Sequence, residues 1–181
     1  MKKSYCISIV LLLITSIQVF AQNDYLVTKT QDTIYGKVRD NFRWFGNKIW
    51  VTNEIGKQVF KYRDISAYSR DGKRYEIIYY PTRRGRMLTY HCQVFSDGKL
   101  KFLVETNADY DEQFLVYQGK TYRLETKYFP QDLWDQLIQC EAFKQKHGAY
   151  HKTSGGRWIW VTKQLNIWYN MVNDYNQFCS N

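Results

Sequence analysis

The sequence predicts an α+β fold, in which an antiparallel β-meander of about eight to ten strands precedes two C-terminal α-helices. Up to residue 126, runs rich in Val, Ile, Tyr and Phe alternate with Gly-Lys dipeptides, as in strands joined by tight turns. From residue 130 onward, apolar residues recur at steps of three and four, the spacing of an amphipathic helix. We expect the sheet to curl into a half-barrel or to fold into a sandwich.

Gly-Lys dipeptides mark the expected turns. They begin at Gly36, Gly56, Gly72, Gly98 and Gly119. Asp71 and Asp97 precede two of them, and Asp-Gly favours tight hairpins because both residues tolerate a positive φ. The spacings are too uneven for a solenoid or a propeller, so the dipeptides indicate hairpins.

The expected strands form five hairpins. They pair residues 25–30 with 33–39, 48–52 with 57–62, 65–69 with 74–80, 87–95 with 99–106, and 114–117 with 120–124.

Two helices are expected after the strands. The first spans about residues 130–145, because Pro130 suits a first helical turn and the apolar residues that follow share one face. The second begins between Trp158 and Lys163 and carries an apolar stripe to Cys179, although residues 158–161 also suit one more strand. Residues 147–156, which end in Ser-Gly-Gly, are expected to form a loop.

Residues 1–21 have the layout of a secretory signal peptide. A positive start with Lys2 and Lys3 precedes an apolar run over 6–20, and Ala21 suits the cleavage position. The run is shorter than the roughly 20 residues of a spanning helix. We therefore expect export to the periplasm, or secretion, with no transmembrane segment in the mature chain. Residues 22–181 suit one globular domain, β-rich over 22–126 and helical over 130–181.

The densest positive charge lies in residues 81–86, Pro-Thr-Arg-Arg-Gly-Arg, in a chain of formal net charge +9. Arg83, Arg84 and Arg86 are a candidate anion-binding clamp, because guanidinium groups suit phosphate and carboxylate. The alternative is a solvated loop that keeps a strand edge from pairing with another molecule. The expected partner is an anionic envelope lipid or glycan, or another envelope protein. Nucleic acid is not expected as a partner of an exported chain.

Three cysteines remain after the expected cleavage: Cys92, Cys140 and Cys179. Cys140 and Cys179 lie on apolar helix faces and are the favoured disulfide pair in a compartment that permits disulfides. Two simple antiparallel helices would hold them more than about 20 Å apart, from the 1.5 Å rise per residue. The bond therefore requires that the two helices cross or that the first helix breaks after Cys140. We expect Cys92 to be a buried small hydrophobe.

Motifs for catalysis or cofactor binding are incomplete. The Gly-Lys-Thr of residues 119–121 lacks the first P-loop glycine, because Phe114 stands there. His91 and Cys92 are neighbours on an expected strand, so their side chains leave opposite faces. The sequence contains neither Gly-x-Ser-x-Gly nor His-Glu-x-x-His. We therefore expect no catalytic residue, no cofactor and no enzymatic activity.

Metal-binding patterns are also incomplete. His147 and His151 have helical i, i+4 spacing but lack a nearby carboxylate or cysteine, so we expect solvated loop histidines. Residues 107–112 resemble the start of a calcium loop, yet Glu112 stands where that loop needs glycine and Gln118 where it needs an acid. No metal site is expected.

Short motifs of this chain resemble those of small exported proteins of Bacteroidetes bacteria whose activity is not assigned. They are Phe-Ala-Gln at 20–22, Asp-Thr-Ile-Tyr-Gly-Lys-Val at 32–38, the Asp-Gly-Lys hairpins, Gly-Lys-Thr-Tyr-Arg-Leu at 119–124, and Asp-Tyr-Asn at 174–176. The resemblance implies an envelope location and assigns no functional residue.

These observations favour an exported envelope protein that acts as a non-enzymatic binding or structural module. One alternative is a half-barrel that carries a lipid or small molecule in a cavity lined by aromatic residues. A second is a hydrolase of envelope or glycan substrates, which needs two carboxylates that meet in the fold.

Overall fold

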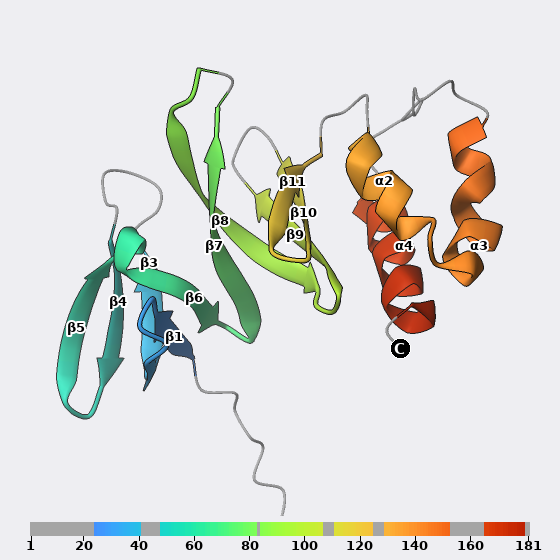
Figure 1. The fold of residues 1–181 in the computed structure, drawn as a ribbon. Helices are drawn as coiled ribbons and strands as arrows, with labels where there is room; N and C mark the ends of the chain where they lie inside the picture. Colours follow the sequence, from blue (N-terminus) through green and yellow to red (C-terminus); the bar gives the residue numbers. More distant parts are fainter. Residues whose placement is uncertain are drawn as a thin grey trace, which may run out of the picture.

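The computed structural model describes residues 24–40, 48–82, 84–106, 111–124, 129–152 and 165–179. It confirms the α+β fold. The described strands form an eight-stranded antiparallel sheet and a three-stranded antiparallel sheet, and three described α-helices follow them (Figure 1).

The eight-stranded sheet has the order β11-β10-β9-β8-β7-β6-β1-β2. Its strands are β1 (Tyr25–Thr28), β2 (Thr33–Tyr35), β6 (Ile65–Arg70), β7 (Lys73–Pro81), β8 (Met87–Ser96), β9 (Leu100–Thr106), β10 (Asp111–Tyr117) and β11 (Lys120–Arg123). Strands β6 to β11 form the expected meander, and the β1–β2 hairpin joins it through β6. Because β11 and β2 end the order, the described sheet is open.

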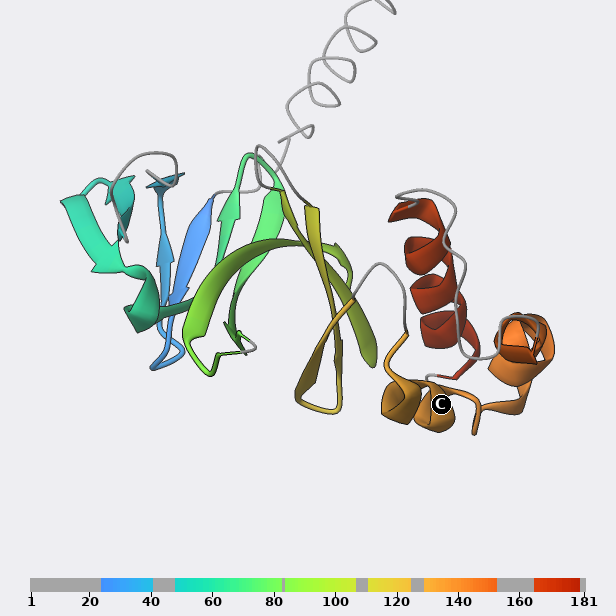
Figure 2. The same cartoon turned by 90° about the horizontal axis from the view of Figure 1, so that it is seen from above.

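The three-stranded sheet has the order β3-β4-β5. It comprises β3 (Lys37–Asp40), β4 (Lys48–Asn53) and β5 (Gly56–Lys61), and the 3-10 turn η1 (Tyr62–Asp64) leads from β5 into β6. The small sheet lies at one end of the molecule and the helices lie at the other (Figures 1 and 2).

Gly36 corrects one expected strand. Residues 33–39 were expected as one strand, but the strand is interrupted at Gly36 (φ +150°), where the chain passes from one sheet to the other. A Cβ at Gly36 would lie 2.6 Å from the carbonyl oxygen of Thr52, so only glycine fits this close approach. Asp24 holds the crossing, because its backbone oxygen accepts from the Gly36 amide (3.0 Å) and its carboxylate accepts from the Val38 amide (3.2 Å).

The turns also differ in part from the expectation. Asp71 (φ 52°) and Gly72 (φ 73°) both adopt the positive φ expected of a tight Asp-Gly hairpin. Gly98 has no positive φ, and a Cβ there would lie 2.5 Å from Cγ of Asn176. The Asn176 amide closes this turn from helix α4 (Leu165–Phe178), because it accepts from the Leu100 amide (3.0 Å) and donates to the Leu100 carbonyl (2.8 Å).

The first expected helix is two helices. Helix α2 (Gln131–Leu137) ends before a turn over 138–140, and α3 (Glu141–Lys152) begins after it. In one continuous helix, Phe143 would lie off the apolar stripe that contains Leu133 and Leu137. The turn reorients α3, so Phe143 is fully buried in the same core as those two residues. Residues 147–152 were expected in a loop and are helical instead.

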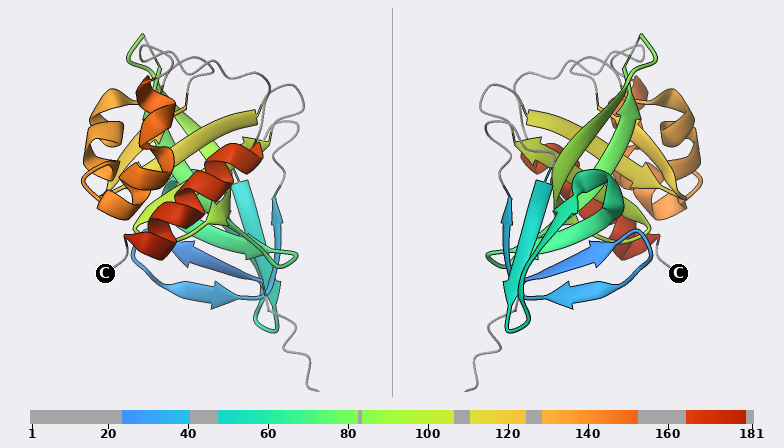
Figure 3. Two further views of the ribbon diagram at one scale, coloured as in Figure 1. Left: turned by 90° about the vertical axis from the view of Figure 1, so that its right-hand side faces the viewer. Right: turned by 90° about the vertical axis from the view of Figure 1, so that its left-hand side faces the viewer.

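Helix α4 (Leu165–Phe178) crosses the face of the sheet that α2 also covers (Figure 3). Trp168, Met171, Val172 and Tyr175 pack with Phe102 and other side chains of β9 to β11. The expected helix start and the alternative strand at 158–161 lie outside the described residues. No described helix is both long enough and apolar enough to cross a membrane.

Candidate functional site

The inward face of the three-stranded sheet belongs to the core. Val38, Ile49 and Val51 are at most 2% exposed, and they pack with Leu26 of β1 and Ile65 of β6. Since side chains alternate along a strand, burial of these residues fixes which side chains point outward.

The outward face carries a concentration of positive charge. We call it the cationic face, and it consists of Lys37, Arg39, Lys48, Trp50, Thr52, Lys57, Val59 and Lys61. All five cations are exposed, whereas Trp50 is partly buried and Val59 is 54% exposed.

Strand register arranges these side chains in rows. Arg39, Trp50 and Val59 form the central row, so an aromatic and an aliphatic side chain lie between the cations. On one side, Lys48 lies directly opposite Lys61. Like charges in directly opposed positions destabilise a sheet, so folding alone does not favour this pair.

The three strands contain one acid, and it does not neutralise the cationic face. Asp40 shares the inward parity of Val38. Its carboxylate forms an ion pair with Arg70 and accepts a hydrogen bond from the Tyr68 hydroxyl (3.2 Å). Burial, followed by the nearby Asp40 charge, raises the pKa of the Tyr68 hydroxyl far above its ordinary value.

Within the described part of the chain, none of the five cations forms an ion pair with a carboxylate. Lys57 instead lies over the ring of Trp50, with its Nζ 4.6 Å from the ring centroid. The side chains are therefore available to an anionic partner.

Exposed apolar side chains lie at one end of the cationic face. Ile55, in the β4–β5 turn, is 88% exposed, and Tyr35 at the end of β2 is 61% exposed. Asn53 connects them, because its amide donates to the Tyr35 carbonyl (3.1 Å) and its side-chain oxygen accepts from the Ile55 amide (3.1 Å). Tyr35 and Ile55 therefore form an apolar tip, which borders the row of Lys37, Thr52 and Lys57.

The arginine segment lies at a different place, the turn between β7 and β8. Arg84 and Arg86 are exposed, and Arg83 lies outside the described residues. Backbone hydrogen bonds close the turn, from Thr82 to Arg86 (2.8 Å) and from Gly85 to Thr82 (2.9 Å). The arrangement leaves both expectations open, the anion clamp and the solvated loop.

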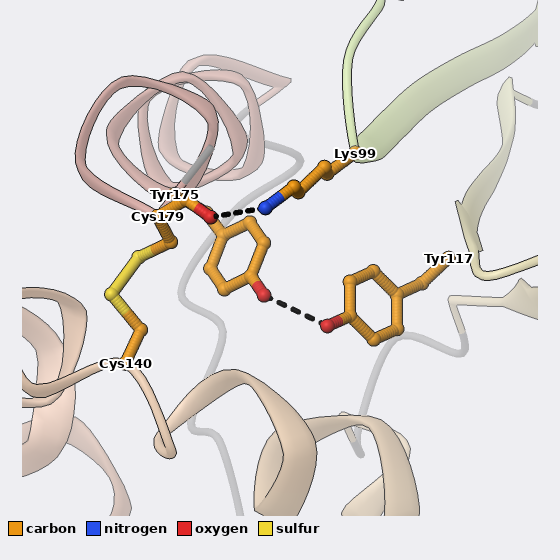
Figure 4. The surroundings of a disulfide bond; sticks show 5 residues. All are labelled: Lys99, Tyr117, Cys140, Tyr175 and Cys179. Carbon is orange, nitrogen blue, oxygen red and sulfur yellow. Dashed lines mark hydrogen bonds between the residues drawn. A yellow bond between two sulfur atoms is a disulfide. The ribbon is translucent and has the colours of Figure 1, made fainter. Parts of the chain in front are cut away.

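The favoured cysteine pair forms a disulfide. Cys140 and Cys179 are bonded, with Cα atoms 6.0 Å apart (Figure 4). The chain turns at residues 138–140, so Cys140 stands at the start of α3 and beside the end of α4. This turn at Cys140 replaces the uninterrupted helix that would have kept the sulfurs apart. Nearby, the Lys99 ammonium donates to the Cys179 carbonyl (3.1 Å), and the Tyr117 and Tyr175 hydroxyls are hydrogen-bonded (2.8 Å).

His91 and Cys92 lie on opposite faces of β8, as expected. The His91 ring contacts Tyr62 edge-on at 3.7 Å between centroids, while Cys92 is fully buried beside Tyr90 and Phe114. Burial lowers the pKa of His91 to about 4, so its imidazole is neutral at pH 7.

His147 is not a solvated loop residue. It lies in α3, and its Nε2 is 2.9 Å from Oδ2 of Asp174 in α4. Of His151, the structure describes only the helical backbone. Among the described residues, no group of three or more His, Cys, Asp or Glu side chains is placed to hold a metal ion.

Two carboxylates meet across β9 and β10. Glu105 lies directly opposite Glu112. Glu112 forms a bidentate ion pair with Arg123, in which the Arg123 Nε donates to Oε2 of Glu112 (2.8 Å). Glu105 is 3% exposed. This pair has the residue types of a hydrolase, but Glu105 is closed off from a substrate in solution.

Sequence reasoning missed the cationic face, although a signal was present. In residues 37–39, 48–52 and 57–61, every second position is Lys, Arg, Trp, Thr or Val, and the positions between them hold the inward residues. This charge does not form a run of consecutive cations, because strand side chains share a face only at every second residue.

No protein-family model matches the chain, and no curated protein or solved structure matches it either.

Proposed function

We propose that this protein is an exported, non-enzymatic binding module that docks on an anionic lipid surface of the envelope through its cationic face. One observation carries the proposal: five cations without carboxylate partners among the described residues surround Trp50 and Val59 on one exposed sheet face. The Cys140–Cys179 disulfide supports export, because disulfides persist in oxidising compartments.

Charge provides the long-range attraction. A Lys or Arg beside an anionic bilayer contributes about 1 kcal/mol, so five contribute about 5 kcal/mol, or roughly 10³–10⁴-fold in partitioning. This attraction weakens with salt, because the screening length falls from about 10 Å at 0.1 M to about 3 Å at 1 M.

Apolar side chains provide the short-range contact. Tryptophan prefers the interface between headgroups and hydrocarbon, and Trp50 lies at the centre of the face. Val59 beside it and Ile55 at the neighbouring tip are exposed aliphatic groups that a lipid surface would cover.

The two alternative functions have less support. A carrier needs a cavity within the sheet, but Cys92, Leu103 and Phe114 fill one sheet face and are fully buried. A hydrolase needs an accessible acid, and burial of Glu105 opposes that role.

Vesicle co-sedimentation tests the proposal. The wild-type protein should bind vesicles that contain phosphatidylglycerol, ignore pure phosphatidylcholine vesicles, and dissociate as NaCl rises. The variant Lys48→Gln, Lys57→Gln, Lys61→Gln should bind about 100-fold more weakly, from about 1 kcal/mol for each lysine. Its melting temperature should be unchanged or slightly higher, because the Lys48–Lys61 opposition is relieved.

A matched variant controls for net charge. Lys73, Lys120 and Lys144 are exposed on β7, β11 and α3, and changing all three to Gln removes the same charge. This variant should bind vesicles much like wild type. Equal losses in both triple variants would show non-specific attraction and overturn the proposal. Binding to a soluble acidic polysaccharide but not to vesicles would overturn the choice of lipid.

A further inference from the structure

A cavity of about 380 Å³ is lined by residues of α3 and α4, and these helices lie at the end of the molecule opposite the three-stranded sheet (Figure 1). The two helices cross, because Figure 2 shows α3 end-on and α4 from the side, and they touch where Phe143 contacts Tyr175 and His147 contacts Asp174. The volume falls within the roughly 300–1,000 Å³ typical of small-molecule sites.

Asp174 is at the centre of the polar wall. Its Oδ1 accepts from the Lys146 ammonium (2.8 Å) and its Oδ2 contacts Nε2 of His147 (2.9 Å). Burial acts to raise the pKa of Asp174, but the hydrogen bonds from Lys146 and His147 outweigh burial and lower it overall. An ionised Asp174 beside a charged Lys146 leaves little net charge at the wall.

Two asparagines add open hydrogen-bonding groups. The side-chain oxygen of Asn173 accepts a hydrogen bond from the Ser96 hydroxyl (2.7 Å). This bond fixes the orientation of the amide, so its NH₂ group can donate to a ligand. Asn170 lines the cavity from an exposed position, and no side chain in the described ranges hydrogen-bonds to it. The wall therefore offers donors from Lys146 and both amides, and acceptors from Asp174 and Asn170.

The remaining lining is apolar. Met171 is 2% exposed and Ile167 is 40% exposed, and both border the cavity from α4. A ligand in the cavity would therefore contact C–H surface on one side and polar groups on the other.

From this arrangement we infer a binding site for a neutral sugar ring. A hydroxyl group both donates and accepts, so neighbouring hydroxyls match a wall in which donors and acceptors alternate. The internal Lys146–Asp174 pair gives a charged ligand no unpaired counter-charge. Met171 and Ile167 match the C–H face of the ring.

Saturation-transfer NMR with a panel of neutral monosaccharides, amino acids and fatty acids, followed by titration, tests the site on the full mature chain. At least one sugar should bind saturably. Asn170→Ala should weaken it roughly tenfold, the effect of one or two lost hydrogen bonds. Asn170 is exposed, so the variant should keep the wild-type melting temperature.

Gln177→Ala is the matched control, because Gln177 is an exposed α4 amide that does not line the cavity. It should bind the sugar as wild type does. The inference is overturned if no sugar binds, if both variants bind alike, or if only amino acids or fatty acids bind. The cationic-face lysine variant should bind sugar normally, so this result is independent of the lipid proposal.

Discussion

Glu105 of β9 lies directly opposite Glu112 of β10, and the surroundings of the two carboxylates differ. Arg123 pairs with Glu112, whereas Glu105 is buried and accepts a hydrogen bond from the His91 amide (3.2 Å). Burial, the largest cause, raises the pKa of Glu105 to about 7 from 4.5. The charged neighbour Glu112 acts in the same direction.

The contribution of Glu105 to stability should consequently fall as pH rises toward neutrality, whereas the lowered pKa of His91 makes the contribution of that residue rise over the acidic part of the same range. The folded-state pKa of Glu105 lies above its unfolded value, so its contribution is fully present below pH 4.5 and is lost as pH rises through about 7. The lost contribution is about 3 kcal/mol from the size of the shift. Glu105→Gln should remove this dependence, as measured by urea unfolding from pH 4.5 to 8. Glu54→Gln in the exposed β4–β5 turn should follow wild type. Identical pH profiles for wild type and Glu105→Gln would contradict the assignment.

The disulfide should stabilise the helical end of the molecule. It closes a sequence separation of 39 residues, which corresponds to about 4 kcal/mol when loop entropy alone is counted. Changing Cys140 and Cys179 to Ser should lower the free energy of unfolding by up to that amount. A reducing agent should destabilise wild type and leave the double variant unaffected. Free thiols at both positions in unreduced peptide maps would disprove the bond.

The arginine turn should matter little for stability. Changing Arg83, Arg84 and Arg86 to Gln should shift the melting temperature by less than about 2 °C, because Arg84 and Arg86 are exposed and exposed side chains contribute little to stability. If the arginines act as an anion clamp, the variant also loses salt-sensitive binding to phosphatidylglycerol vesicles. If its vesicle affinity equals that of wild type across a salt series, the turn is a solvated loop and the clamp is wrong.

Local patterns allowed most of the fold to be predicted. Strand alternation and glycine turns depend on residues close in sequence, so the hairpins β4–β5, β6–β7, β8–β9 and β10–β11 were recognisable. The sheet change at Gly36 was not, because it follows from the approach of Thr52, a residue in another hairpin. The helix break before α3 likewise depends on tertiary packing, because it allows Phe143 to be buried in the core.

The candidate sites depended even more on tertiary structure. The Glu105–Glu112 pair and the Lys48–Lys61 pair exist only through strand register, and the α3–α4 cavity only through helix packing. The cysteine pair could be predicted because few cysteines remain to choose from. The cations of the cationic face occupy alternate positions in the strands of residues 37–61, which the sequence shows. That they share one face follows only from the pairing of these strands in one sheet.

A reporter on the cationic face tests directly whether that face docks on an anionic lipid surface. An environment-sensitive fluorophore can be attached through Val59→Cys, because Val59 is 54% exposed and the native Cys92 is fully buried. Tyr169→Cys, 39% exposed on α4, is the matched control at the opposite end of the molecule. With phosphatidylglycerol vesicles at low salt, the label at position 59 should shift to the blue and the label at 169 should not. Equal shifts at both positions, or a shift only at 169, would contradict docking through the cationic face.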